Sequence, residues 1–302
     1  MSPVIRLIAL LGVLAISFTA VLVRLADVSP LTAGFFRAAY ALPVLFGLWL
    51  LTRRSDRRSP ADRRLGFVSG LILAVDLWLF HSAIAAIGAG LGTLLANIQV
   101  VFVALAAWAI HDERPSTTAF IAIPVVFTGV ALLSGLGRAD AYGSDPVAGV
   151  ILGAFSGIAY ASFILTYRTA NRSQSSAVGT LLDATVGVAV GTGLFGLVTG
   201  TLDLSFVWPA HGWLMAIALI AQVFGWIMIG YALPRLPALT TSVLIMMQPI
   251  GALIWGALIF SERLSVLQGT GVAIILFGVT AINVRGSVRP PATNLAEPST
   301  PH

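Results

Sequence analysis

Four strongly polar side chains fall in the middle of long apolar runs in this chain: Arg37, Asp76, Gln99 and Gln248. If those runs are helices that cross a membrane, a rise of about 1.5 Å per residue places all four roughly 15–21 Å from one membrane face. Ionised and amide groups are costly in hydrocarbon, so each is a candidate for binding a solute or carrying a proton. The four residues predict a polar site near the middle of the membrane.

Gln99 and Gln248 form the best pair because they occupy equivalent positions in two similar stretches of the chain. Each amide offers an acceptor and a donor, so we expect the two to hold one solute from opposite sides. Pro249 removes a backbone donor beside Gln248 and should bend the helix there. The alternative is that both amides only join neighbouring helices. Asn97, two residues before Gln99, points to another helical face, so at most one of them should face the site.

Asp76 fits two functional roles, a proton carrier or a fixed anion that binds an ammonium group of the solute. A third possibility is a structural ion pair with Arg37, because the depths of the two residues differ by only about 5 Å. Arg37 lies near one boundary of its run, so it could also extend outward to the interface without a partner. These alternatives stay open at the level of sequence.

Three further side chains complete the candidate site. His81, five residues beyond Asp76, could relay a proton or form a packing hydrogen bond. The rings of Tyr160 and Trp226 could stack on a planar or cationic solute, or could serve core packing and interface anchoring. Glycines beside Trp226 leave room around its ring, which favours a place at the site.

Two acidic residues at helix ends are expected to act in structure or gating. Glu113 and Glu262 are each followed by arginine and end equivalent runs, where they can dock to helix termini and loops. The role of Asp183 stays open.

The elements that position these residues are membrane-spanning helices. The chain is 58% hydrophobic and 10% charged, which is far from the composition of soluble proteins. Continuous apolar runs lack the alternation of a β-barrel. Arg6 and the run after it resemble a signal peptide, but the run is needed to complete the first set of spans. Ten spans are expected, at 4-23, 31-51, 65-87, 91-110, 117-136, 147-167, 177-198, 212-233, 238-260 and 266-284.

The chain contains two copies of one plan. Residues 91-134 reappear as 240-283 without a gap, so that Glu113-Arg114 matches Glu262-Arg263. Five spans per copy, an odd number, would invert the second copy relative to the first. We predict repeats at 1-136 and 147-286, followed by a disordered cytoplasmic tail at 287-302, which is rich in Pro, Ser and Thr.

The basic residues orient the chain. Histidine aside, all of them are arginine, and a topology with both termini in the cytoplasm places roughly 13 arginines inside against 3 outside. This bias predicts a multi-pass protein of the plasma (cell inner) membrane. It also explains the basic isoelectric point without a nucleic-acid partner.

Several classes of chemistry lack support in the sequence. Cysteine is absent, so neither a disulfide nor a thiolate metal site is expected. No phosphate loop, Gly-x-Ser-x-Gly or His-Glu-x-x-His motif occurs, so no cofactor, metal or enzymatic activity is expected.

The paired repeats, the run from Ser29 to Arg37, and the Glu-Arg pairs that end the fourth and ninth spans resemble the EamA type of the drug/metabolite transporter superfamily. The resemblance covers nearly the whole chain. It implies that spans one, three, four, six, eight and nine surround a central cavity, with the fifth and tenth to one side at a possible homodimer contact. Similar proteins export amino acids, nucleobases, other metabolites or toxic compounds.

Together these features predict a secondary active transporter of small organic metabolites, amino-acid-like or drug-like, that exports them by alternating access and is driven by protons. Its partners would be the solute and the lipid bilayer. The competing hypothesis is a non-transporting membrane scaffold or sensor, which would not require polar residues to converge at the midplane from both repeats.

Overall fold

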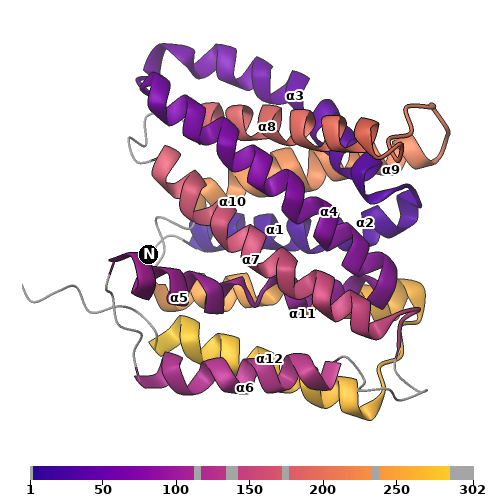
Figure 1. The fold of residues 1–302 in the computed structure, drawn as a ribbon. Coiled ribbons are helices and arrows are strands. Elements are labelled where there is room, and N and C mark those ends of the chain that lie inside the picture. Colours follow the sequence, from indigo (N-terminus) through magenta and orange to yellow (C-terminus); the bar gives the residue numbers. More distant parts are fainter. Residues whose placement is uncertain (1–2, 112–116, 134–141, 172–176, 233–237, 286–302) are drawn as a thin grey trace, which may run out of the picture.

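The structure is a computed structural model that describes residues 3–111, 117–133, 142–171, 177–232 and 238–285. All regular structure in these residues is helical (Figure 1). The first half contains α1 (Pro3–Ser17), α2 (Thr19–Ala26), α3 (Pro30–Thr52), the short turn η1 (Arg53–Ser55), α4 (Pro60–Ala96), α5 (Gln99–His111) and α6 (Thr117–Leu133). The second half contains α7 (Pro146–Ala170), α8 (Ala177–Val198), α9 (Ala210–Ala216), the π-helical segment η3 (Ile217–Gly225), α10 (Trp226–Ala232), α11 (Ala238–Phe260) and α12 (Val266–Arg285).

The described helices confirm an all-helical membrane fold. Six segments are long and apolar enough to cross a membrane: Val4–Ala26, Pro30–Ser55, Pro60–Val103, Pro146–Ala170, Ala177–Val198 and Ala210–Ala232. Shorter apolar helices lie at Phe120–Leu133, Met247–Phe260 and Val266–Ala281. The count of ten spans stays a prediction. The predicted disordered tail and Glu113 lie outside the described residues.

α4 consists of two helical stretches that meet at a kink at Gly88, which lies at the boundary predicted between the spans 65-87 and 91-110. α4 continues from Pro60 to Ala96, and its backbone turns at Gly88, where φ is 86° and ψ is 171°. Glycine adopts such angles without the steric cost that a Cβ would impose. The chain therefore changes direction without an intervening loop, and the predicted span 91-110 is divided between the end of α4 and α5.

Three long helices begin at the same sequence signature, a capping residue followed by proline. In α3 the hydroxyl of Ser29 accepts a hydrogen bond from the backbone N–H of Thr32, and in α7 Asp145 accepts one from Ala148. In α4, Ser59 and Asp62 form a reciprocal capping box. Because proline lacks the N–H that would be unpaired at a first helical position, each helix start is fixed locally.

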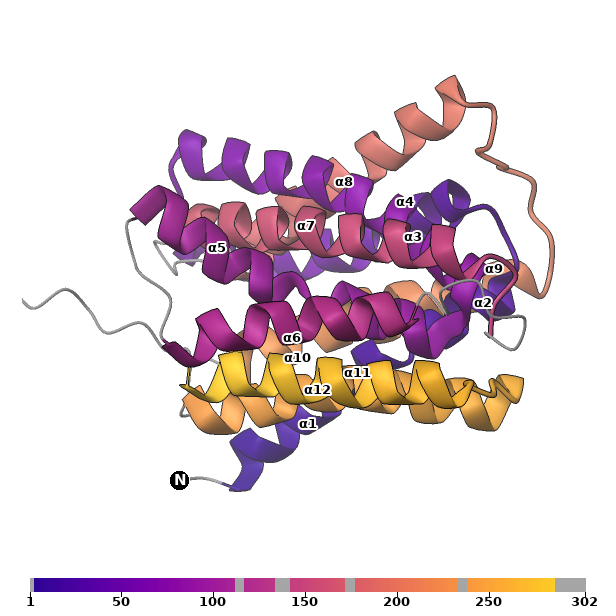
Figure 2. The ribbon, with the colours of Figure 1, turned by 60° about the horizontal axis from the view of Figure 1, so that its bottom comes forward.

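Helices of the first half pack mainly against helices of the second half. α4 packs against α7 and α8, α3 packs against α8 and η3, and α1 packs against α10, η3 and α11. α6 and α12 lie side by side at one flank of the bundle (Figures 1 and 2). The largest buried apolar cluster joins the end of α4 to this flank. Helices that correspond in the two predicted repeats make corresponding contacts: α1 with α10, and α7 with α4.

Glycines allow the closest helix contacts between the halves. At Gly70 of α4, the Cα atom of Gly187 in α8 lies 2.9 Å from the position a Cβ would take, and the carbonyl oxygen of Ala184 lies closer still. The stripe Gly149, Gly153 and Gly157 of α7 lies against side chains of α4 and of the turn after it. The long crossing of α4 over the second half therefore depends on residues without side chains.

We expect Gly70→Ala to destabilise the protein by about 1–3 kcal/mol, because the added methyl group would overlap the backbone of α8. Gly47→Ala in α3 is the matched control, because a Cβ there meets nothing within 4 Å. Thermal unfolding in detergent, followed by circular dichroism, measures both. Equal melting temperatures for the two variants would contradict a tight α4–α8 contact.

Candidate functional site

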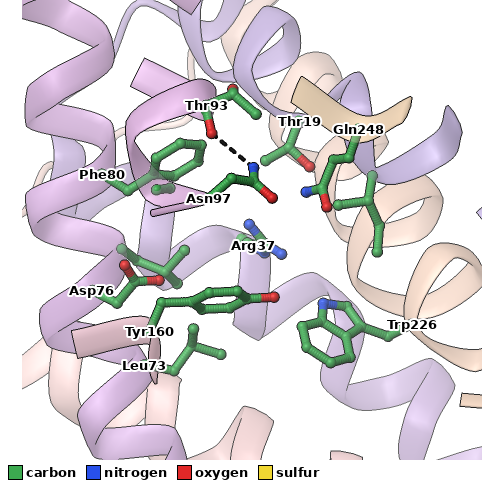
Figure 3. A pocket seen from close by; sticks show the side chains of 13 residues that line it. Thr19, Arg37, Leu73, Asp76, Phe80, Thr93, Asn97, Tyr160, Trp226 and Gln248 are labelled. Carbon is green, nitrogen blue, oxygen red and sulfur yellow. Dashed lines mark hydrogen bonds between the residues drawn. The ribbon is translucent and has the colours of Figure 1, made fainter. Parts of the chain in front are cut away.

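A cavity of about 60 Å³ lies inside the bundle, between helices of both halves (Figure 3). The first half contributes residues from α1, α2, α3 and α4, and the second half contributes residues from α7, α10 and α11. The lining residues are Ile16, Thr19, Arg37, Leu73, Asp76, Leu77, Phe80, Thr93, Ala96, Asn97, Tyr160, Trp226 and Gln248.

Five of the predicted site residues line this cavity: Arg37, Asp76, Tyr160, Trp226 and Gln248. They come from five different helices, and Figure 3 shows their side chains gathered around one space. The other two predicted residues, Gln99 and His81, are not among those that line it.

Arg37 is buried in α3 and is held by a side chain of the second half. Its Nε donates a hydrogen bond to Oε1 of Gln222 at 2.8 Å, and Nε2 of Gln222 donates to the hydroxyl of Thr185 at 3.2 Å. Arg37 therefore stays inside the protein instead of extending to the interface. Gln222 was not among the predicted site residues, although it is a glutamine within a predicted span, as Gln99 and Gln248 are.

Asp76 is buried in α4 and is also held by the second half. Its Oδ1 accepts a hydrogen bond from the hydroxyl of Ser156 in α7 at 2.6 Å. Among the described side chains, no ion pair within 4.0 Å joins Asp76 to Arg37, although both line the cavity. The structural ion pair considered from the sequence is therefore not formed in this conformation. Ser156 was missed because serine in a glycine-rich helix resembles a packing residue.

The structure does not bring the two glutamines together on this cavity. Gln248 lines it, whereas the amide oxygen of Gln99 is buried and finds no hydrogen-bond partner among the described residues. The interruption of the helix between Ala96 and Gln99 explains the difference, because the prediction for Gln99 assumed one continuous helix over 91-110. Asn97, at the end of α4, lines the cavity instead, with its amide nitrogen bonded to the carbonyl of Thr93 at 2.9 Å.

His81, Tyr160 and Trp226 contact other parts of the protein. Nδ1 of His81 lies 3.2 Å from the carbonyl oxygen of Pro30, which joins α4 to the start of α3. The ring of Trp226 meets that of Phe163 edge to face, at 5.6 Å between centroids, and Phe163 also contacts Tyr160. Trp226 and Tyr160 therefore belong to an aromatic wall that continues from the cavity into the core.

Glu262 closes the end of the bundle at which α4 turns. One carboxylate oxygen accepts the backbone N–H of Ala89 at 2.8 Å and pairs with Nη1 of Arg24 at 2.5 Å, and the other accepts the N–H of Gly90 at 3.1 Å. The carboxylate lies so close to Gly88 that a Cβ there would be 2.6 Å from it. Glu262 thus docks at a helix terminus, where freed N–H groups and the positive end of the helix dipole favour an anion.

Arg58 closes the opposite end. It pairs with Asp56 at 2.9 Å and with Asp183 of α8 at 2.6 Å, which gives Asp183 a partner that the sequence did not identify. Trp49 donates a further hydrogen bond to Asp56 at 2.9 Å. The hydrogen bond from Arg58 holds the pKa of Asp56 below its usual range, so this carboxylate stays ionised near neutral pH.

Comparisons with known proteins agree on the class. The sequence model of the EamA-like transporter family matches residues 4–135 and residues 147–284. The chain is 25% identical over 266 residues to the Uncharacterized transporter YwfM of Bacillus subtilis (strain 168), which covers 84% of each chain. A crystal structure of a protein superposes with a TM-score of 0.63 at 16% sequence identity, over 95% of this chain and 98% of the other. At that identity the likeness concerns the fold alone.

We expect Glu262→Ala to lower the melting temperature, because it leaves the buried N–H groups of Ala89 and Gly90 without an acceptor. An unsatisfied buried donor costs about 1–3 kcal/mol. Glu262→Gln retains one acceptor oxygen in the same place and should lose less. Thermal unfolding in detergent ranks the three proteins, and an alanine variant as stable as the wild type would show that the N–H groups find other partners.

Proposed function

Since the chain belongs to the EamA-like transporter family, we propose that it is a secondary active transporter that exports small organic metabolites by alternating access. The solutes would be amino-acid-like or drug-like. Its partners are the lipid bilayer, which a multi-pass membrane protein requires, and the transported solute. The family is one of transporters rather than enzymes, and no enzymatic activity is proposed.

One observation supports this function most strongly: a cavity inside the bundle that carries polar side chains from both halves. Arg37, Asp76 and Asn97 come from the first half, and Tyr160 and Gln248 from the second. Transporters built from two repeats commonly hold the solute at the interface of the repeats near the midplane. A scaffold or sensor has no need to gather costly polar groups there.

We also propose ten spans arranged as two inverted repeats, 1-136 and 147-286, with both termini in the cytoplasm of a plasma (cell inner) membrane protein. The corresponding contacts α1–α10 and α7–α4 support a two-fold relation. α1 begins and α12 ends at the same end of the bundle in Figure 1, the end that also holds the arginine-rich turn after α3. The homodimer at the α6–α12 flank stays a prediction.

Alternating access agrees with the small size of the cavity. A volume of about 60 Å³ is small beside the roughly 300–1,000 Å³ of pockets that hold small molecules. The pairs Arg24–Glu262 and Arg58–Asp183 join the two halves at opposite ends. A solute would enter when the halves move apart at one end and leave when they move apart at the other.

Coupling to protons is proposed through Asp76, the acidic residue of the cavity. The charged and titratable groups that share the cavity with it are Arg37 and Tyr160, and Ser156 holds one of its oxygens. A carboxyl group in this position can exchange a proton when the cavity opens to water on either side.

Counterflow in proteoliposomes tests the proposal. Labelled amino acids, nucleosides and small cations are offered at two pH values to the wild type and to Asp76→Asn. We expect one class to accumulate, and Asp76→Asn to reduce its initial rate at least about tenfold or to abolish its pH dependence, because a buried charged contact is lost. Asp203→Asn, on an exposed loop, is the matched control and should transport normally. Folded protein with no flux above that of empty liposomes would contradict transport and favour a scaffold.

A further inference from the structure

Two side chains of opposite charge, Arg37 and Asp76, line the central cavity without direct contact between them. Arg37 and Asp76 are each only 5% exposed, and both reach the same small space. In the part of the chain that the structure describes, no ion pair within 4.0 Å joins them or pairs either one with another residue. In Figure 3 the guanidinium of Arg37 lies near the middle of the labelled side chains, with Asp76 to one side.

Neutral side chains hold both charges in place. Gln222 accepts the hydrogen bond of Arg37 Nε at 2.8 Å and is itself fixed by Thr185, and Ser156 donates to Asp76 at 2.6 Å. These contacts orient the two groups, but an amide and a hydroxyl carry no formal charge. Gln222 and Ser156 are therefore positioning residues: they act on a ligand through Arg37 and Asp76.

A buried charge interacts strongly with an opposite charge, because little water is present to screen it. A solute with only a cationic group would pair with Asp76 and leave Arg37 without an ionic partner. A solute with only an anionic group would do the reverse. A solute that carries both groups compensates both residues at once.

On the premise that the chain transports a small solute through this cavity, we propose that the cavity selects zwitterions. The anionic group binds the guanidinium of Arg37, which suits a planar carboxylate, and the cationic group binds the carboxylate of Asp76. The geometry that supports this assignment is the placement of both charges on one cavity, from α3 and α4, each fixed by a neutral partner of the second half.

The rest of the cavity indicates what the solute carries besides its charges. Leu73, Leu77 and Phe80 of α4 form one apolar side, and Trp226 closes the space from α10. Apolar and aromatic walls favour an apolar remainder of the solute. The selected class is therefore a zwitterion with an apolar substituent.

Matched solutes that differ by one charge test the proposal. Leucine is compared with isopentylamine, which lacks the carboxylate, and with isocaproate, which lacks the ammonium group. Phenylalanine, phenethylamine and hydrocinnamate form a second set. Binding to the purified full-length protein is measured by isothermal titration calorimetry. We expect at least one zwitterion to bind at least about tenfold more tightly than both of its single-charge analogues. An analogue that binds as tightly as its zwitterion, or no saturable binding of either zwitterion, would overturn the proposal.

Two variants that each remove one charge should each lose a different one of the two binding preferences. General damage to the fold would not produce this crossed pattern. Arg37→Gln should lose the preference for zwitterion over amine and keep the preference over acid, and Asp76→Asn should do the opposite. Gln222→Leu should weaken only the preference that depends on Arg37, and Ser156→Ala only the one that depends on Asp76. Asp203→Asn is the control and should leave both preferences unchanged. Identical losses of both preferences in the two charge variants would overturn the assignment of each charge.

Counterflow separates this proposal from the transport function. Flux of an amine or acid analogue that exceeds flux of the zwitterion would overturn the zwitterion proposal and leave transport standing. Selective zwitterion binding, with the crossed pattern but without flux, would support the site and contradict the transport function.

Discussion

The structure depends on which group accepts the hydrogen bonds of the backbone N–H groups freed at the break in α4. Where one helix ends and the next begins, the first backbone N–H groups have no acceptor within the helix, and because Ala89 and Gly90 are buried another part of the protein must accept theirs. Glu262 does this at Gly88, with one carboxylate oxygen for Ala89 and the other for Gly90. The acceptor belongs to the second half of the chain and the bent helix to the first. The contact that makes the break possible also joins the two halves.

The break determines the shape of the cavity. Leu73, Asp76 and Phe80 lie before Gly88 in α4, whereas Thr93 and Asn97 lie after it, and all five line the same space. A straight helix would carry the second group away along its axis, since each residue adds about 1.5 Å. The π-helical segment η3 of the second half also contributes to the cavity, because it contains Gln222, which accepts a hydrogen bond from Arg37. Irregular helix geometry in both halves therefore positions the cavity's charges and walls.

The sequence predicted the break near Gly88, between the spans 65-87 and 91-110, but neither the second interruption between α4 and α5 nor the π-helical segment η3. Depth within apolar runs placed Arg37 and Asp76 at the same level, because helical rise and the cost of buried charge follow from local sequence. The contacts of Gln99 could not be found this way, because they depend on where α4 ends and α5 begins. Gln222 followed the same polar-residue rule and was overlooked, whereas Ser156 gives no signal until the position of α7 is known. The docking of Glu262 at a helix terminus follows from its position at a helix end, but its partner is a terminus in the other half.

The two ends of the bundle differ in what opening them requires. At one end the side chain of Glu262 is only 3% exposed and satisfies two backbone N–H groups besides Arg24, so separation exposes unpaired donors in α4 as well as a charge. At the other end Asp183 is 25% exposed, and within the described part of the chain it bonds to the side chain of Arg58, which is 1% exposed and also pairs with Asp56. Water that already reaches Asp183 can replace Arg58 as the pair separates, which lowers the cost of breaking it. In the proposed cycle, the end held by Arg58 and Asp183 therefore opens from this conformation more readily than the end at which α4 turns.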